Sequence, residues 1–422
     1  MHTPMTRASR LLVVLLCAAL PPAAAAQDGL VVNGRNRSAE IRLGADLGPA
    51  RSDWPDQLAG GGRYSVGYPS GPNDHRVLDR RTGLTIAVPA EARVLAIDPV
   101  RPRLFIRFDN NVTGTIAEFD LTTASSRPLI TVGGTQALWA DRVRYAYSAD
   151  RLFVDVTDGS GPGPYVEAPH PIQVFDGTTG IQVGAFTITT ATDGSLFTTP
   201  WLVTPEGDRA YFGFANFDGT GFITAVRVPD GSAVRLGVPV AQVQWDELNE
   251  RLIGYAWGTL RVLTKELNLL GAAALPPGHA IRVSPHTGRL YVAHGYFHGI
   301  YGGDVNLNVL DSRTFAPLGY VNLGNDYGVG LSLVTAPGAP RAFSATTMRH
   351  DVTLDWANVG AASHFVLDVG LAPDRTDLSV FLGPYSHATF THVPPGTYYL
   401  RLRGGNEFGG GRTSQEIQVV VP

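Results

Sequence analysis

The chain has 422 residues, with 33 lysines and arginines against 37 aspartates and glutamates, and a formal net charge of −4. Lys265 is the only lysine, and no basic stripe of the kind that nucleic-acid binding needs is present. Glycine (49 residues) and proline (30 residues) are frequent, as expected for many short strands joined by turns. The composition therefore excludes a nucleic-acid partner and favours an all-β protein.

Residues 1–26 have the pattern of a secretory signal peptide. Arg7 and Arg10 precede the uncharged apolar run 11–20, and small residues follow up to Ala26. The apolar run is shorter than the roughly 20 residues of a membrane-spanning helix. We therefore expect cleavage after Ala26, a secreted or periplasmic protein and no membrane span. Cys17, the only cysteine, lies in the signal, so the mature chain has no disulfide and no thiolate metal site.

A four-residue segment, Arg-Leu-Phe/Tyr-Val/Ile, recurs along the rest of the chain. Intact copies begin at Arg103, Arg151 and Arg289, and looser copies begin at Arg63, Arg209 and Arg251. Successive arginines are 40, 48, 58, 42 and 38 residues apart. The mean step of about 45 residues is typical of the four-stranded blade of a β-propeller.

Each repeat is predicted to contain four strands. An apolar strand and a polar turn precede the arginine segment, a loop of variable length follows it, and a third strand ends in aspartate before a Thr/Ser/Gly turn and a short fourth strand. The terminal aspartates are Asp79, Asp120, Asp176 and Asp311. Each is expected to accept hydrogen bonds from turn amides about two residues further on.

The repeats can be counted along the chain. Six fairly complete ones span roughly 54–90, 91–131, 138–189, 198–238, 239–276 and 278–323. Residues 329–334 then resemble a first strand, while 30–33 and 39–43 resemble a second and a third strand. Joining these pieces gives a seventh blade and leaves no open sheet edge. Seven blades are therefore expected, although eight stay open because the stretch 131–200 could hide a weak repeat.

The strands resemble those of the YVTN family of bacterial β-propellers. The segments 289–294 (Arg-Leu-Tyr-Val-Ala-His) and 30–34 (Leu-Val-Val-Asn-Gly) carry the resemblance, which covers residues 28–335. It implies a propeller fold. It implies little about function, because the family combines exported proteins of unknown role with lactonase-like relatives.

A different pattern begins after the turn-rich linker 336–340. Val352, Leu354 and Trp356 share one face of a predicted strand, and Tyr398 opens a late strand after a Pro-Pro-Gly turn. These features are typical of an immunoglobulin-like sandwich, and residues 341–422 resemble a fibronectin type III domain. Tyr398 is the expected corner tyrosine. The predicted fold is thus all-β, a seven-bladed β-propeller followed by a fibronectin type III β-sandwich.

The loops between second and third strands should all emerge on one face of the propeller. Several of them are long, polar and aromatic, which is usual for binding sites on a rigid scaffold. The candidate binding residues in them are Asp109, Asn110, Asp158, Tyr165, Phe217, Asp218, His294, Tyr296, His298 and Asp304. Solvent-facing loops without a ligand are the alternative interpretation.

No metal or cofactor is predicted. His294 and His298 are four residues apart, a spacing that brings two ligands together only on a helix, and Gly295 and Gly299 disfavour one. The turn around Asp158 lacks the twelve-residue calcium pattern. No nucleophile elbow is present, so no catalytic residue is assigned. Four tryptophans, Trp139, Trp201, Trp245 and Trp257, are expected to pack between blades, with sugar stacking a distant second interpretation.

Two functions fit these observations. The first is an exported, monomeric, non-enzymatic protein that binds an extracellular protein or glycan, with the sandwich as a spacer or adhesion module. The alternative is an extracellular hydrolase, lyase or lactonase that acts on carbohydrate or lactone at the propeller face. Acidic or histidine side chains from several blades that converge at the axis would favour the enzyme.

Overall fold

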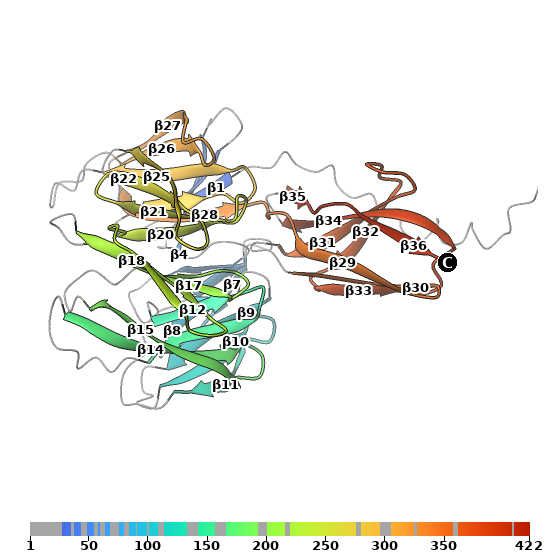
Figure 1. Ribbon diagram of the computed structural model, residues 1–422, viewed down its shortest axis with the longest axis horizontal. Helices are drawn as coiled ribbons and strands as arrows, with labels where there is room; N and C mark the ends of the chain where they lie inside the picture. The colour runs from blue at the N-terminus through green and yellow to red at the C-terminus, as the bar shows by residue number, and fades with distance from the viewer. Residues whose placement is uncertain are drawn as a thin grey trace, which may run out of the picture.

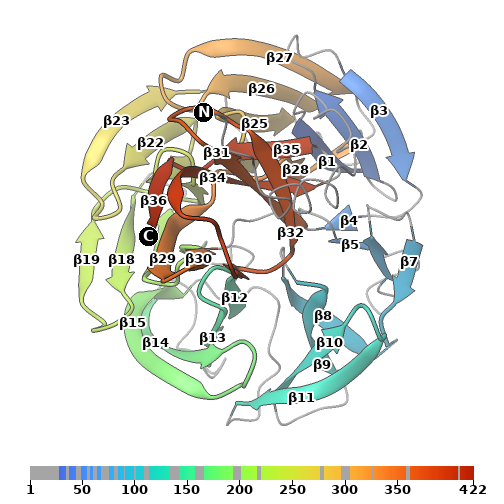
Figure 2. The ribbon, with the colours of Figure 1, turned by 90° about the vertical axis from the view of Figure 1, so that its right-hand side faces the viewer.

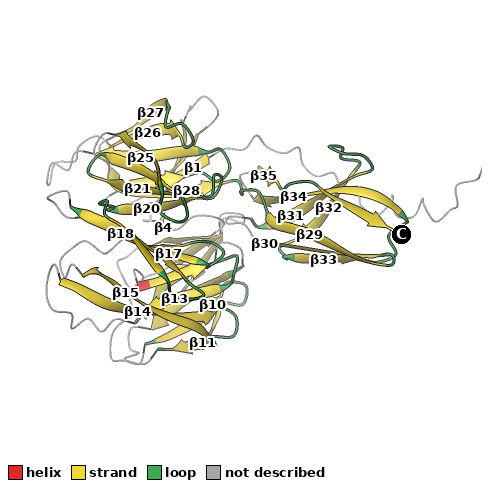
Figure 3. Ribbon diagram, in the orientation of Figure 1, coloured by secondary structure: helices red, strands yellow, loops and turns green. Residues whose placement is uncertain are grey.

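The computed structural model describes most of the chain after residue 27. The described residues are 28–34, 38–43, 49–54, 58–59, 64–67, 76–79, 84–89, 91–98, 101–108, 114–132, 142–156, 166–192, 201–215, 220–275, 280–295, 305–324, 327–357, 362–406 and 409–422. Strands and turns account for them, apart from a short helical kink at Arg142 (Figure 3). The protein is therefore all-β.

Within these residues, seven sheets have four antiparallel strands each. Six of the seven are built from consecutive strands. They are β4(Leu58–Ala59), β5(Tyr64–Gly67), β6(Arg76–Asp79) and β7(Leu84–Ala87); β8(Ala92–Ile97), β9(Arg103–Phe108), β10(Thr115–Asp120) and β11(Ser125–Thr131); β12(Val143–Ala146), β13(Arg151–Asp155), β14(Val166–Asp176) and β15(Gln182–Thr192); β16(Trp201–Val203), β17(Arg209–Ala215), β18(Gly221–Arg227) and β19(Ala233–Leu236); β20(Gln242–Asp246), β21(Arg251–Ala256), β22(Thr259–Leu263) and β23(Leu269–Ala274); β24(Ala280–Val283), β25(Arg289–Gly295), β26(Val305–Asp311) and β27(Pro317–Gly324).

The seventh sheet combines both ends of the ring. Its strand order is β28(Tyr327–Thr335), β1(Asp28–Gly34), β2(Ser38–Leu43) and β3(Pro49–Trp54). Residue Leu30 lies opposite Leu333, and Val32 lies opposite Leu331. One boundary from the sequence was wrong. Trp54 was expected to open the next repeat, but it ends β3, the outer strand of this closing sheet, which the sequence analysis did not predict.

The seven sheets form a ring (Figure 2). The fourth strand of each sheet lies on the circumference, and the first strands lie toward the centre, where β8, β12, β16, β20, β24 and β28 contact one another in succession. The arginine segment explains how the sheets pack. Leu104 and Ile106 belong to a buried cluster shared with the preceding sheet, whereas Phe105 joins a cluster shared with the following sheet. Alternation along the strand thus gives each sheet two apolar faces, and burying one such side chain contributes roughly 1.5–3 kcal/mol.

Residues 341–421 form two further sheets. One has the order β29(Arg341–Met348), β30(Asp351–Ala357), β33(His387–Phe390). The other contains β32(Leu378–Gly383), β31(His364–Gly370), β34(Gly396–Asn406) and β35(Gly409–Thr413), with β36(Ile417–Val421) also paired to β34. Their facing sides enclose an apolar core in which Trp356 lies edge-on to Phe365, with ring centroids 5.5 Å apart. As predicted for a corner tyrosine, the Tyr398 hydroxyl donates to the carbonyl of Pro394 at 2.9 Å.

This pair of sheets lies against one face of the ring (Figure 1). Arg341 contacts Glu206 Oε1 at 3.0 Å, and Asn406 donates to the carbonyl of Thr335 at 2.7 Å. Glu206 and Glu247, which also contacts Arg341, lie in turns between first and second strands. We call this the sandwich face. Because neighbouring strands are antiparallel, connections between second and third strands lie on the opposite face, which we call the loop face.

Candidate functional site

The candidate binding residues from the sequence lie almost entirely outside the described residues. Asp109, Asn110, Asp158, Tyr165, Phe217, Asp218, Tyr296, His298 and Asp304 all do so, and Trp139 does as well. His294 is in β25, where its backbone pairs with Asn306 of β26 at the loop-face end of both strands. The assignment of these side chains to a ligand surface stays a prediction.

One described aromatic side chain stands exposed on the loop face. Trp257 and Gly258 form the two-residue connection between β21 and β22, with φ values of 48° and 76°. Two positive φ values define a hairpin turn that favours Asn-Gly, and tryptophan there is an uncommon choice. The Trp257 side chain is 49% exposed. The expectation that it packs between blades was therefore wrong.

Two other tryptophans are packed as the sequence predicted. Trp201 is buried and stacks on Phe212, with ring centroids 5.4 Å apart, and the Arg144 guanidinium lies over its ring. Trp245 stacks on Tyr211 of the preceding sheet, at 6.4 Å. Trp257 differs because it occupies a turn, and the Trp-Gly pair between two apolar strands was the sequence signal that could have revealed it.

A histidine and an aspartate meet at the loop-face end of β13 and β14. His170 Nδ1 lies 3.1 Å from Asp155 Oδ2, and both side chains are mostly buried. The hairpin backbone fixes this approach, because the amide of Val156 donates to the carbonyl of Pro171 at 3.0 Å. A carboxylate in this position orients the imidazole ring. The pairing of the two side chains follows from the register of β13 and β14, which the sequence does not display.

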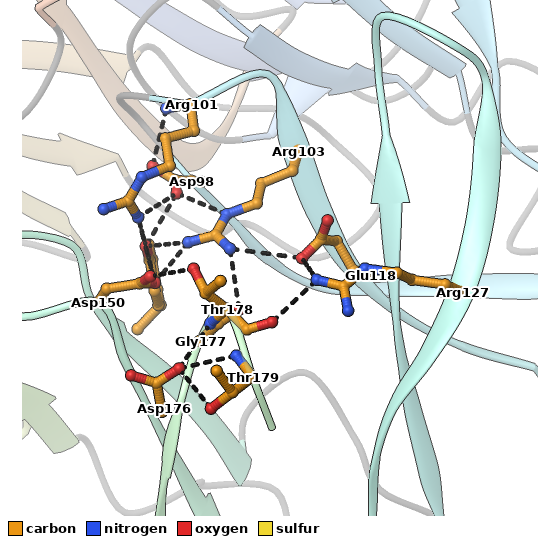
Figure 4. Close-up of polar contacts among 11 residues, drawn as sticks. Asp98, Arg101, Arg103, Glu118, Arg127, Asp150, Asp176, Gly177, Thr178 and Thr179 are labelled. Carbon is orange, nitrogen blue, oxygen red and sulfur yellow. Dashed lines mark hydrogen bonds and ion pairs between the residues drawn. The ribbon is translucent and has the colours of Figure 1, made fainter. Parts of the chain in front are cut away.

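The densest polar network lies between the sheets β8–β11 and β12–β15 (Figure 4). We call it the arginine cluster; it comprises Asp98, Arg101, Arg103, Glu118, Tyr145, Asp150 and Thr178. Arg103 Nε lies 2.9 Å from Asp98 Oδ2, and its terminal nitrogens contact Asp150 and, at 2.8 Å, the carbonyl of Gly177. Arg101 Nη1 lies 3.1 Å from Asp150 Oδ1. Two arginines thus neutralise two mostly buried aspartates.

The pKa values in the arginine cluster argue against acid–base chemistry there. Burial alone would raise the pKa of Asp150, but the charge of Arg103 and a hydrogen bond from Thr178 hold it below its usual value. Burial, and then the negative charge of Asp98, raise the pKa of the Tyr145 hydroxyl well above its usual value. Tyr145 therefore stays protonated and Asp150 stays ionised at neutral pH. The cluster holds two sheets together.

The same arrangement recurs in another sheet, at a second copy of the repeated arginine. Arg251 Nε lies 3.0 Å from Asp246 Oδ2, and Arg251 also contacts the carbonyl of Ser312 in the next sheet. Ser312 follows the terminal aspartate of its third strand, as Gly177 does. Those terminal aspartates accept hydrogen bonds from turn amides, as predicted. For example, the amide of Thr179 lies 2.7 Å from Asp176 Oδ1.

In the closing sheet, Asp28 occupies the position of the repeated arginine. Its partner across the ladder is Thr335, as Asp246 is the partner of Arg251. The Asp28 carboxylate is fully buried. Four hydroxyl groups lie within hydrogen-bond distance of it: Ser284 at 2.7 Å, Thr335 at 2.6 Å, and Tyr291 and Thr287 at 2.5 Å.

A cavity of about 480 Å³ lies at the junction between the ring and the sandwich sheets. Glu247, Leu248, Pro285, Phe343 and Gln415 are among its lining residues. Burial raises the pKa of the Glu247 carboxyl, which accepts a hydrogen bond from Tyr147 at 3.2 Å. Arg341 contacts Glu206 and Glu250 at this junction, and its positive charge also acts on Glu247.

Among the described residues, no three histidine, cysteine, aspartate or glutamate side chains are grouped closely enough to hold a metal ion. A search of the same part of the chain for a helix with the length and apolar character of a membrane span found none.

No known protein family and no curated protein matches the sequence. Solved structures of low identity do match. A eukaryotic initiation factor is 8% identical, with 80% of this chain and 97% of that chain covered and a TM-score of 0.42. The extracellular domain of a putative one-component system from B. thetaiotaomicron is 10% identical, with a TM-score of 0.39; the match covers 94% of this chain but only 57% of that one. A protein called FN3tt is 16% identical over 20% of this chain and 97% of its own length, with a TM-score of 0.18. These likenesses assign neither family nor function.

Proposed function

We propose that this chain is an exported binding protein whose loop face recognises an extracellular glycan. In this proposal residues 28–335 are a seven-bladed β-propeller of the YVTN type, 336–340 are a linker, and 341–422 are a fibronectin type III domain. Residues 1–26 direct export to the periplasm or the exterior. The seven four-stranded sheets and the pairing of β1 with β28 support the propeller assignment.

The two faces of the ring support binding on the loop face. The sandwich face is engaged by Arg341 and Asn406, whereas the second-to-third-strand connections point the other way. A rigid ring with long connections gathered on one face is a common arrangement for ligand recognition.

Trp257 is the observation that carries the proposal. Trp257 places a half-exposed indole in a turn that favours Asn-Gly, where its backbone conformation is unfavourable. Such a local departure from the favoured residue points to function. An exposed indole offers a flat apolar face and an N–H donor, which suit the apolar face and the hydroxyls of a sugar ring.

The described acidic groups favour binding over hydrolysis. Asp28, Asp98 and Asp246 are fully buried, and hydroxyl or guanidinium donors already contact each of them. They lie near the sandwich face, away from the proposed ligand. The hydrolase or lyase alternative would have to use residues of the loop connections or the Asp155–His170 pair at the loop face.

The test is a glycan array with the full mature chain and two variants. Trp257→Asn creates the favoured Asn-Gly turn, so we expect unchanged or slightly higher thermal stability together with loss of glycan binding. Tyr320→Asn, at a side chain 69% exposed on the outer strand β27, is the matched control and should bind normally. Equal binding by wild type and Trp257→Asn would contradict the proposal. Release of shortened glycans would instead establish the enzymatic alternative.

A further inference from the structure

The sandwich holds a second cavity, at the end that lies away from the ring (Figure 1). Its volume of about 420 Å³ falls within the roughly 300–1,000 Å³ that is typical of small-molecule sites. Leu354 of β30 lines one side of it, and Leu367 of β31 and Leu400 of β34 line the other. These strands belong to the two facing sheets. The cavity, which we call the slot, is therefore a space between the two sheets of the sandwich.

The slot opens along one side of the sandwich, between β32 and β33. These are edge strands of different sheets, and they do not pair with each other. Leu378 of β32 lines the slot and is 44% exposed, and Thr391 and His392, which follow β33, line it and are exposed as well. Leu354 and Leu367, in contrast, are buried. Exposure thus increases from the back of the slot to its mouth.

The apolar side chains around the slot are packed less completely than those at the ring end of the same core. Trp356 and Phe365, toward the ring, are buried against each other. Val369, Val380 and Phe390, which line the slot, are only partly buried. The lining of an unfilled apolar space loses dispersion contacts, and such a space readily accepts an apolar ligand. The slot is therefore suited to an apolar group.

Polar side chains in the lining of the slot gather at its mouth. They are Thr389, Thr391 and His392, all from β33 and the turn that follows it. The other polar side chain in the lining, Tyr398, already donates its hydroxyl to the carbonyl of Pro394. A ligand with an apolar body and one polar end matches this distribution.

Hydrogen bonds hold the turn at the mouth against the neighbouring hairpin. The amide of His392 lies 3.2 Å from Asp351 Oδ1, and the amide of Val393 donates to the carbonyl of His350 at 2.8 Å. Both acceptors lie where β29 turns into β30. The rim of the slot is therefore part of the sandwich framework, as expected for a largely preformed site.

The shape of the slot favours a single alkyl chain over a peptide strand. Stacked sheets are only about 10 Å apart, so a strand with side chains on both faces does not fit between them. An added strand would pair with β32 or β33 in the plane of a sheet instead. Within 341–422, the segments outside the described residues are 358–361 and 407–408, and the residues that flank them, such as Ala357 and Asn406, lie at the ring end. The occupant is therefore sought outside the sandwich sequence.

Charged groups beside the mouth favour a neutral head group. Arg375 pairs with Asp377, the residue before Leu378, at 2.6 Å. Arg349 lies two residues before Asp351 in the adjoining hairpin. Neither sign of charge is in excess among these four residues, so an ionised head group gains little there. Hydroxyl groups can hydrogen-bond with threonine and histidine side chains without needing a counter-charge.

We propose that the slot binds the acyl chain of a neutral single-chain lipid of the monoacylglycerol class. The alkyl chain lies between Leu354 and Leu367, and the hydroxyls of the head group contact Thr391 and His392 at the mouth. This site is separate from the loop face, because the sandwich lies against the opposite face of the ring (Figure 1).

The test is isothermal titration of the full mature chain with monomeric 1-monolauroylglycerol, with monoacetin as the analogue that has the same head group and almost no chain. We expect one lipid per chain and an affinity at least about a hundredfold above that for monoacetin, since each buried methylene strengthens binding by a factor of about four. Dodecanoate, which has the same chain and an ionised head, should bind more weakly than 1-monolauroylglycerol.

Two substitutions locate the binding site. Val380→Phe fills the slot, so it should weaken lipid binding at least about tenfold and leave the thermal midpoint equal or higher. Val420→Phe, at an exposed position on the outer side of β36 in the same sheet, is the matched control and should bind normally. If the phenylalanine at 380 prevents folding, Leu378→Asp places a carboxylate at the exposed mouth and should also weaken binding.

The inference is overturned if 1-monolauroylglycerol does not bind, or if it binds equally to wild type and to folded Val380→Phe. Tighter binding of dodecanoate would overturn the neutral head group. Dimerisation in sedimentation experiments that Leu378→Asp abolishes would show that a second copy covers the slot, and would also overturn the inference. Trp257→Asn should bind the lipid normally, so this inference and the glycan proposal fail independently.

Discussion

In both the arginine cluster and the closing sheet, a charged residue at the start of the second strand joins two neighbouring sheets, but the two charges have opposite signs. In the arginine cluster, Arg103 reaches across to the carbonyl of Gly177 in the next sheet. In the closing sheet, Asp28 lies at the same strand position and accepts hydrogen bonds from hydroxyl groups, three of which belong to the preceding sheet. In the first case a cation donates hydrogen bonds to the following sheet. In the second case an anion accepts hydrogen bonds from the preceding sheet. The first residue of the second strand can therefore join its sheet to the following or to the preceding sheet, provided that hydrogen-bond partners there compensate for its charge.

The difference follows from where the chain begins its ring. Asp28 is the first residue of β1, so the closing contact joins residues 256 to 307 positions apart in the chain. The arginine cluster joins residues separated by fewer than 80 positions. A long loop costs more entropy to close, although the cost rises only slowly with length. The buried carboxylate and its hydroxyl donors thus belong to the least local strand pairing of the described ring.

The sequence predicted the strands better than it predicted their contacts. The repeated arginine marked the period, and residues 30–33, 39–43 and 329–334 do lie in strands, because alternating apolar residues are a local signal. The partner of Arg103 lies 74 residues away and is a backbone carbonyl, which no sequence pattern displays. Trp257 was misjudged because burial was assumed from residue type, while turn geometry decided it.

Removing the cation from the arginine cluster should have the largest effect. Arg103→Met leaves Asp98 and Asp150 with Arg101 as their remaining shared cation in a mostly buried place, and breaking a buried pair costs up to about 3–5 kcal/mol. Denaturant unfolding would measure this loss. The control is Arg127→Met, because Arg127 is 53% exposed where it contacts Glu118 and should change stability by less than about 1 kcal/mol. Similar losses for the two variants would refute the role given to Arg103.

Neutralising Asp28 tests the closing sheet. Asp28→Asn keeps the shape but replaces a charged acceptor and turns one oxygen into a donor that faces hydroxyl groups. We expect a loss of about 1–3 kcal/mol, the range for leaving buried polar groups poorly paired. Hydrogen exchange should then show faster opening of β1 and β28 than of β9 and β10. Asp230→Asn, at an exposed turn where the carboxylate caps Ser232 and contacts Arg227, should leave that exchange pattern unaltered. Uniform acceleration across all sheets would contradict a local closing role.

A substitution at the junction between the ring and the sandwich should change stability least. Its pH dependence should be opposite to that of the arginine cluster. A lowered pKa means that the contribution of Asp150 is present above the usual aspartate pKa and is lost as the pH falls through its folded value. The raised pKa of Glu247 reverses the sign: its contribution is present below the usual glutamate pKa and is lost as the pH rises through its folded value. Glu247→Gln should therefore stabilise the protein at pH 7 by ~0.5 kcal/mol, and the gain should vanish in acid.

Scanning calorimetry between pH 4 and 8 would follow this prediction, with the pH range set by the usual carboxyl pKa values. Glu250→Gln is the matched control, because Glu250 is 69% exposed and its oxygen lies 3.7 Å from Arg341. Its effect should be small and independent of pH. A lower thermal midpoint for Glu247→Gln at pH 7 would mean that the charged carboxylate strengthens the junction through Arg341. In that case the ring–sandwich contact, like the arginine cluster, would be stabilised by an ionised carboxylate beside an arginine. The two contacts would then differ only in how exposed their side chains are.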